Sequence, residues 1–265
     1  MTTEYLLKQE KIVRAETENF YGKNREGFCD FALDAVELMI QGTGYLKNIN
    51  VDSLNEKGEY KNFNDAIRVF SYFHYYRVTL TFLATYKLLL NGYYTEAAIL
   101  LRSIVETFVK LKYLYSQKDI ELITLAFAGH KGWNGKKFNI SYENQFDKVA
   151  PGLYRFYRQL CDMAHGAISA ILLKTDWKSS GLILDEGLLF KDLESSFIVN
   201  QYSAYLLAHI EFMSVVYPEI KDNQPDQYAA QYHKTLTILW SFMDQVSTKE
   251  KNKPWYDAVK NLIKS

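Results

Sequence analysis

Apolar residues recur along this chain at steps of three and four positions, which is the spacing of one face of an α-helix. The clearest stripe comprises Ala97, Leu100, Ile104, Phe108 and Leu111. A second long helix is predicted just before it, from an N-cap at Asn64 to the helix-ending pair Asn91-Gly92. Because the connection between these two helices is so short, we expect them to pack as an antiparallel hairpin.

The remaining chain shows the same periodicity, interrupted where Gly and Pro fall. Helices are predicted over about 4–20, 25–41, a short stretch from 118, 151–173, 191–217, 225–246 and a last short stretch from 254. Gly42-Thr43-Gly44 should end the second helix, and 45–61 and 129–138 should be loops. One small β-hairpin is expected within Trp177–Phe190. The predicted fold class is therefore all-α, a helical bundle in a single domain over residues 1–265.

Composition narrows the classes of function. The chain of 265 residues has 31 Lys+Arg and 31 Asp+Glu, so it lacks the overall basic charge of many nucleic-acid-binding proteins and carries no DNA-specific signal. The overall charge does not exclude a local basic patch on the surface. Its two cysteines, Cys29 and Cys161, suit a reducing compartment. The most apolar windows, Thr79–Leu90 and Ala97–Leu114, contain charged residues, and no signal peptide is evident. We expect a cytoplasmic protein with no membrane span.

A polar row on the helix after Pro151 is the first candidate site. Arg158 and His165 are seven residues apart, about two helical turns, so they lie on nearly one line with Asp162 between them. Asp162 would orient the imidazole, and Arg158 would hold an anion. The same row is also what the polar edge of an ordinary amphipathic helix looks like, and both interpretations stay open.

A charged pair on the second helix of the hairpin is the next candidate. Arg102 and Glu106 are four residues apart, and Tyr113 continues their face. That face points away from the apolar stripe, yet its neighbours are apolar too, so we expect the pair to be largely buried. An internal salt bridge that holds the hairpin is the simpler interpretation, and a functional role is the alternative.

These two stretches together carry a resemblance. The phrases AAILLRSIVE (97–106) and LCDMAHG (160–166) resemble a widespread family of uncharacterised bacterial helical proteins, which is similar to the HEPN superfamily. The superfamily is marked by an arginine and a later histidine on one helix with four to six residues between them, and Arg158 and His165, with six residues between them, match at the longest spacing. The resemblance covers about residues 63–173.

The resemblance implies a helical bundle, commonly a homodimer, that is a metal-independent ribonuclease in many members, with a role in stress or defence. His165 would be the general acid and base, and Arg158 would stabilise the charge that develops on the phosphate. Arg102, Glu106, Asp162 and Tyr113 would support them. This chain has Gln159 after the arginine, where nuclease members often have Asn, Asp or His.

Motifs for other chemistry are missing from the sequence. It has no phosphate-binding loop, dinucleotide fingerprint, His-Glu-x-x-His helix or nucleophile elbow, so no cofactor and no metal is expected. Two hypotheses follow: an RNA-cleaving or RNA-binding protein, and a non-enzymatic helical module that binds a protein or a ligand.

Overall fold

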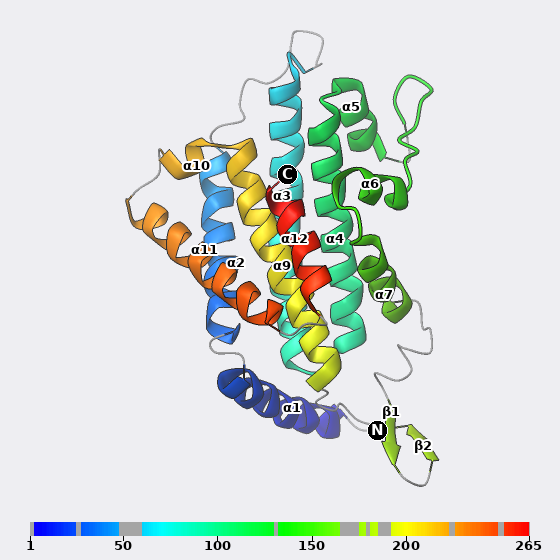
Figure 1. Ribbon diagram of the computed structural model, residues 1–265, viewed down its shortest axis with the longest axis vertical. Helices are drawn as coiled ribbons and strands as arrows, with labels where there is room; N and C mark the ends of the chain where they lie inside the picture. The colour runs from blue at the N-terminus through cyan, green and yellow to red at the C-terminus, as the bar shows by residue number, and fades with distance from the viewer. Residues whose placement is uncertain are drawn as a thin grey trace.

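The computed structural model describes residues 3–24, 28–47, 60–129, 132–164, 175–178, 181–184, 192–222, 226–248 and 252–264. These parts of the chain are almost entirely helical, which confirms the all-α fold class (Figure 1). The helices are α1 (Thr3–Asn24), α2 (Phe28–Lys47), α3 (Phe63–Leu90), α4 (Tyr94–Gln117), α5 (Ile120–Ala128), α6 (Tyr142–Val149), α7 (Tyr154–Ala164), α9 (Asp192–Val216), α10 (Glu219–Asp222), α11 (Asp226–Ser247) and α12 (Lys253–Lys264).

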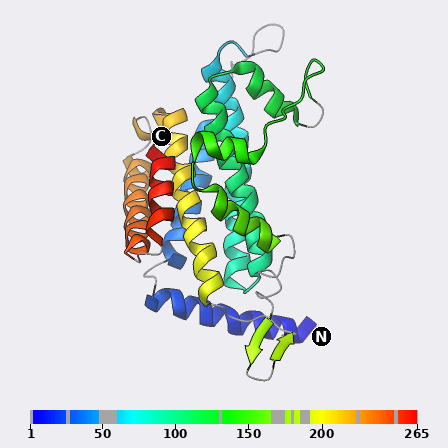
Figure 2. The same cartoon turned by 45° about the vertical axis from the view of Figure 1, so that its right-hand side comes forward.

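Three long helices, α3, α4 and α9, form the centre of the bundle (Figures 1 and 2). Asn91–Tyr93 link α3 to α4; Gly92 has a φ of 82°, and the Tyr93 amide donates to the Leu88 carbonyl over 2.9 Å. The ten residues 201–210 of α9 are all buried. A helix that is buried on every side lies inside a bundle, and α3, α4, α11 and α12 all pack against α9.

Gly42 corrects the predicted end of the second helix. The sequence places a stop at Gly42-Thr43-Gly44, but α2 continues to Lys47. A Cβ atom on Gly42 would lie 2.9 Å from the Tyr228 hydroxyl and 3.6 Å from the Tyr75 hydroxyl. This glycine therefore allows close packing of α2 against α3 and α11, and it does not end the helix.

The N-cap of α3 is a second correction. Asn62, and not Asn64, accepts a hydrogen bond from the Asp65 amide (2.9 Å), and its side-chain amide donates to the Asp65 carboxylate. Both asparagines satisfy the sequence rule for a cap, so only the backbone geometry separates them.

Three short helices, α5, α6 and α7, lie on the outer side of the α3–α4 pair (Figure 1). The sequence prediction missed α6, which begins after the capping residue Ser141, and also the single turn of α10. Pro151 was predicted to start a helix; it lies in a turn, and α7 begins at Tyr154. The predicted continuation to residue 173 lies outside the described residues beyond Ala164.

Two strands, β1 (Thr175–Lys178) and β2 (Gly181–Leu184), pair antiparallel with Thr175 opposite Leu184. They overlap the range 177–190 in which a β-hairpin was predicted, and residues 185–190 are not among those described. Across the described helices, none combines the length and apolar character that crossing a bilayer requires.

Candidate functional site

The Arg102–Glu106 pair predicted on α4 forms. Arg102 Nε lies 2.8 Å from Glu106 Oε1, and the two side chains are 27% and 19% exposed. They are therefore half-buried, with an edge open to solvent. Burial alone would lower the pKa of Arg102, but the hydrogen bond and charge of Glu106 outweigh it and raise that pKa.

Two tyrosines from other helices approach the same carboxylate. The Tyr157 hydroxyl of α7 donates to Glu106 Oε1 over 2.7 Å, and the Arg102 guanidinium carbon lies 6.0 Å from the centre of the Tyr157 ring. Burial first, and then the bond to Glu106, raise the pKa of Tyr157. Burial and the charge of Glu106 raise the pKa of Tyr142, on α6, to about 12. Glu106 thus joins α4 to α6 and α7.

Two more cations, Lys110 and Arg77, interact electrostatically with members of this group. Lys110 is one turn further along α4. Its pKa is lowered, because burial and the charge of Arg77 of α3 outweigh the opposing effect of the Glu106 carboxylate. The Lys110 ammonium also lies 5.8 Å from the Phe138 ring centre. Arg77 is exposed. We call Arg77, Arg102, Glu106, Lys110, Tyr142 and Tyr157 the Glu106 cluster.

The Glu106 cluster carries an excess of positive charge. Arg102 pairs with Glu106, the charge of Glu106 acts on Lys110, and the charge of Arg77 acts on Lys110 and Tyr142, so three cations accompany one carboxylate and leave a net charge of about +2 at neutral pH. The half-buried Arg102 and Lys110 and the exposed Arg77 repel one another, so a bound anion would stabilise them and replace the water that burial has removed from the first two. The arrangement suits a phosphate or carboxylate ligand.

His74 borders the cluster as a neutral group. Burial first, and then the charges of Lys110 and Arg77, lower its pKa to about 4. Its ring packs against Phe70 at 4.3 Å between centres, and Nδ1 is buried without a hydrogen-bond partner among the described residues. At pH 7 the imidazole adds no charge to the site.

The row predicted on α7 is only partly described. Arg158 and Asp162 are both exposed on the outer side of α7, and the Tyr154 hydroxyl first, then the charge of Asp162, raise the pKa of Arg158. His165 lies outside the described residues. The half-buried Cys161 contributes to the pKa values of both Arg102 and Arg158, so the outer row adjoins the Glu106 cluster.

Tyr113 does not belong to this site. It was predicted to continue the Arg102–Glu106 face, but it is 7% exposed and packs within the hydrophobic core. The groups that sequence reasoning missed are Arg77, Lys110, Tyr142 and Tyr157. Lys110 had a signal, since it follows Glu106 by four residues. The two tyrosines had none, because only the packing of α6 and α7 on α4 brings them to Glu106.

No group of three or more potential metal-ligating side chains gathers anywhere in the described ranges. The Glu106 cluster has one carboxylate among cations, and that composition repels a metal ion.

Comparison with known proteins gives one match. A model described as a family of unknown function (DUF5677) matches residues 68–144, less than a third of the chain. The match contains most of the Glu106 cluster and ends before Tyr157 and Arg158. No curated protein and no solved structure matches.

Proposed function

We propose that this protein is a HEPN-like RNA-binding protein that cleaves RNA without a metal ion. In this proposal the Glu106 cluster contacts RNA phosphates, and His165 with Arg158 performs the cleavage. The observation that carries the proposal is that Arg102 and Lys110 share a single carboxylate, Glu106, with the charge of Arg77 acting on Lys110, directly beside the helix that bears Arg158.

The charges of the site support binding to phosphates. Lysine and arginine side chains that neutralise phosphates provide most of the sequence-independent affinity for nucleic acid. Arg158 and Arg77 are exposed and can meet a strand at the surface, while Arg102 is held by its ion pair with Glu106 and Lys110 is attracted by the same carboxylate. Glu106 and its two tyrosines would then fix the cations in place before RNA arrives.

The proposed reaction uses groups of the chain alone. The His165 imidazole takes the proton of a ribose 2′-hydroxyl, whose oxygen attacks the adjacent phosphorus. The bond from phosphorus to the 5′-oxygen breaks, and that oxygen receives a proton from the imidazolium. Arg158 stabilises the added negative charge of the phosphorane. The products are a 2′,3′-cyclic phosphate and a 5′-hydroxyl.

An RNA cleavage assay in EDTA tests the reaction. Wild-type protein should release products ending in 2′,3′-cyclic phosphate, and His165→Ala should lower the rate at least a hundredfold. His233→Ala, which changes an exposed histidine on α11, is the matched control and should cleave normally. Cleavage by His165→Ala at the wild-type rate, or cleavage of 2′-O-methylated RNA, contradicts the mechanism.

A non-enzymatic interaction module is the second candidate. The observation in its favour is an apolar stripe on α3, where Phe73, Tyr76 and Leu80 are 55%, 53% and 51% exposed and follow one another at helical spacing. In this case the Arg102–Glu106 pair only stabilises the bundle. Arg102→Ala would then lower the melting temperature of a protein that has no RNA cleavage to lose.

A further inference from the structure

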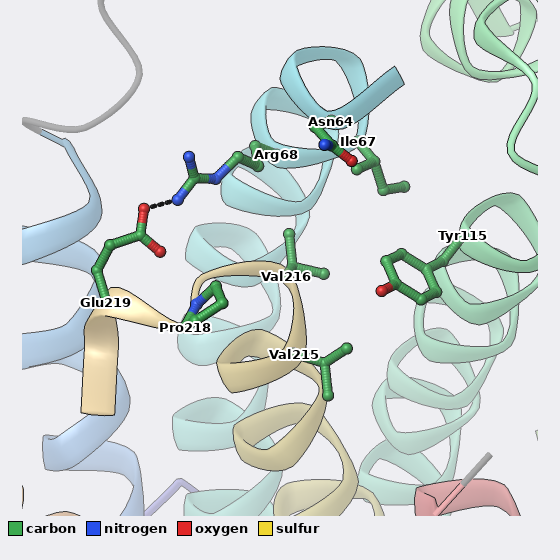
Figure 3. Close-up of a pocket in the computed structure, with 8 residues that line it drawn as sticks. All are labelled: Asn64, Ile67, Arg68, Tyr115, Val215, Val216, Pro218 and Glu219. Carbon is green, nitrogen blue, oxygen red and sulfur yellow. Dashed lines mark ion pairs between the residues drawn. The ribbon is translucent and has the colours of Figure 1, made fainter. Parts of the chain in front are cut away.

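A pocket lies where the first turn of α3, the last turns of α4 and the end of α9 meet (Figure 3). Its volume is about 520 Å³, within the range of pockets that hold small molecules. It shares no residue with the Glu106 cluster. The lining residues are Asn64, Ile67, Arg68, Tyr115, Val215, Val216, Pro218 and Glu219.

An ion pair forms one wall of the pocket. Arg68 and Glu219 pair through Nη2 and Oε1, and their side chains are 27% and 28% exposed, so the pair reaches the pocket surface. The Arg68 guanidinium also stacks on the Tyr217 ring, 4.7 Å from its centre, which holds the arginine in place. Because the two charges cancel, the wall favours a ligand without net charge.

The same wall has hydrogen-bonding capacity that the protein leaves unused. Arg68 Nε, a donor, and Glu219 Oε2, an acceptor, are buried and have no partner among the described residues. A buried polar atom without a partner costs about 1–3 kcal/mol, and such atoms in native proteins usually have a reason. These two atoms are themselves enclosed, but the exposed part of the pair presents further guanidinium donors beside the carboxylate, and a ligand edge that offers one acceptor beside one donor would pair with them.

The rest of the pocket is mostly apolar. Val215 and Val216 lie between the ion pair and Tyr115, with Ile67 above them, as Figure 3 shows. The Tyr115 ring is held by the Phe212 ring at 5.6 Å, and its hydroxyl is directed toward Val216. A ligand therefore needs an apolar body that lies on the valines and polar groups at its edges.

We propose that this pocket binds a nucleobase: an uncharged ring with apolar faces whose edge carries a hydrogen-bond donor next to an acceptor. The acceptor of the base edge faces Arg68, and its donor faces Glu219. The base belongs either to a free nucleoside or to a single-stranded RNA. The inference does not depend on RNA cleavage, since the Glu106 cluster and α7 contribute nothing to the pocket.

Isothermal titration with the four ribonucleosides tests the ligand class. Each nucleoside is compared with a counterpart whose edge donor is methylated, for example adenosine with N6,N6-dimethyladenosine. At least one nucleoside should bind, and its methylated counterpart should bind at least tenfold more weakly, because Glu219 then loses its donor. If all four fail to bind, or if methylation leaves the affinity unchanged, the proposal is overturned.

Val215→Trp tests the location. Val215 is 50% exposed, so a larger side chain fits there without disturbing the core, and it would fill the pocket. Nucleoside affinity should fall at least tenfold. Ile99→Trp, a similar change at a 45% exposed position of α4, is the control and should bind as wild type. Wild-type affinity in a folded Val215→Trp protein contradicts the proposal.

A single-stranded hexa-adenylate separates the two sources of the base. If it displaces adenosine from the wild-type protein, the pocket accepts bases within a strand; if it does not, the ligand is the free nucleoside. Nucleoside binding is measured without any RNA cleavage, and Val215→Trp leaves α7 and the Glu106 cluster intact, so failure here and failure of the RNA cleavage test are distinguishable.

Discussion

Glu106 holds together side chains from three helices, although it is a single residue. Its Oε1 atom accepts from both Arg102 and Tyr157, and its charge acts on Lys110 and Tyr142. A carboxylate in this position stabilises the fold and at the same time reduces the positive charge that an anion would meet. These two effects have opposite consequences for a substitution, so one variant separates them.

Glu106→Gln should weaken the fold and strengthen anion binding. Glutamine keeps the shape but loses the charge-assisted bonds from Arg102 and Tyr157, so the free energy of unfolding should fall by about 1–3 kcal/mol. The net charge of the cluster rises by one, so affinity for single-stranded RNA should increase. Chemical denaturation and fluorescence anisotropy measure the two effects. Glu143→Gln, an exposed change on α6, should alter neither. Weaker RNA binding by a folded Glu106→Gln protein would contradict the account.

His209 makes stability depend on pH. It is buried between the Phe82 and Phe108 rings, and burial first lowers its pKa to about 4, with the Tyr205 carbonyl opposing and His74 adding to the shift. The unfolded chain takes up this proton near pH 6.5, but the folded chain takes it up only near pH 4. The stabilisation is therefore complete above pH 6.5 and is lost as the pH falls to 4, on the order of 3 kcal/mol.

His209→Phe should reduce this loss. The variant keeps an aromatic ring between Phe82 and Phe108 but cannot titrate, so its free energy of unfolding should fall less between pH 6.5 and 4 than that of the wild type. The pH-dependent loss of stability that His74 causes remains in this variant, since the pKa of His74 is also lowered to about 4. Urea denaturation across this range measures the slope, with the exposed His233→Phe as control. An unchanged slope in His209→Phe would mean that His209 is not the source.

At the scale of elements, the long helices are predictable and their ends are not. The apolar periodicity of α4 is repeated over many turns, and α3 and α9 are long apolar stretches without Gly or Pro, which gives a strong signal for all three. α6 has eight residues, too few for a periodic pattern, and its position depends on Phe146, which is buried in the core. Gly42 is another feature that the sequence alone does not predict. Its sequence signal is that of a helix end, but its role is set by contact with Tyr228 of α11, which is far from it along the chain.

The two glycines of α2 provide a matched pair. Gly42→Ala should destabilise the fold, because its Cβ would meet the Tyr228 hydroxyl at 2.9 Å and force the α2–α11 contact apart. Gly44→Ala should stabilise it by about 0.5–1 kcal/mol, because nothing lies within 4 Å and alanine favours the helix. Thermal unfolding compares them. Equal effects of the same sign would show that α2 does not pack as described.

At the scale of the whole molecule, the balanced net charge gives no indication of the local cationic cluster. The chain balances 31 basic against 31 acidic residues, which argued against a general basic footprint and left a local patch open. The fold creates that patch by bringing Arg77 of α3 close enough to Lys110 of α4 for their charges to interact, one turn from the Arg102–Glu106 pair. Arg158 could be identified from the sequence, because Asp162 and His165 follow it at helical spacing on the same predicted helix. Arg77 could not, because its role depends on the pairing of two helices.

The central claim is that this cationic cluster binds RNA phosphates, and the salt dependence of RNA affinity tests it most directly. Anisotropy titrations of a labelled single-stranded RNA at several salt concentrations give the slope of log affinity against log salt. Arg77→Gln with Lys110→Gln should weaken binding at least tenfold and reduce the slope by about 1.4, since each phosphate contact on a single strand contributes about 0.7. Lys87→Gln with Lys234→Gln removes equal charge from exposed sites elsewhere and should change the slope little. Equal slopes and affinities in the two double variants would contradict the claim.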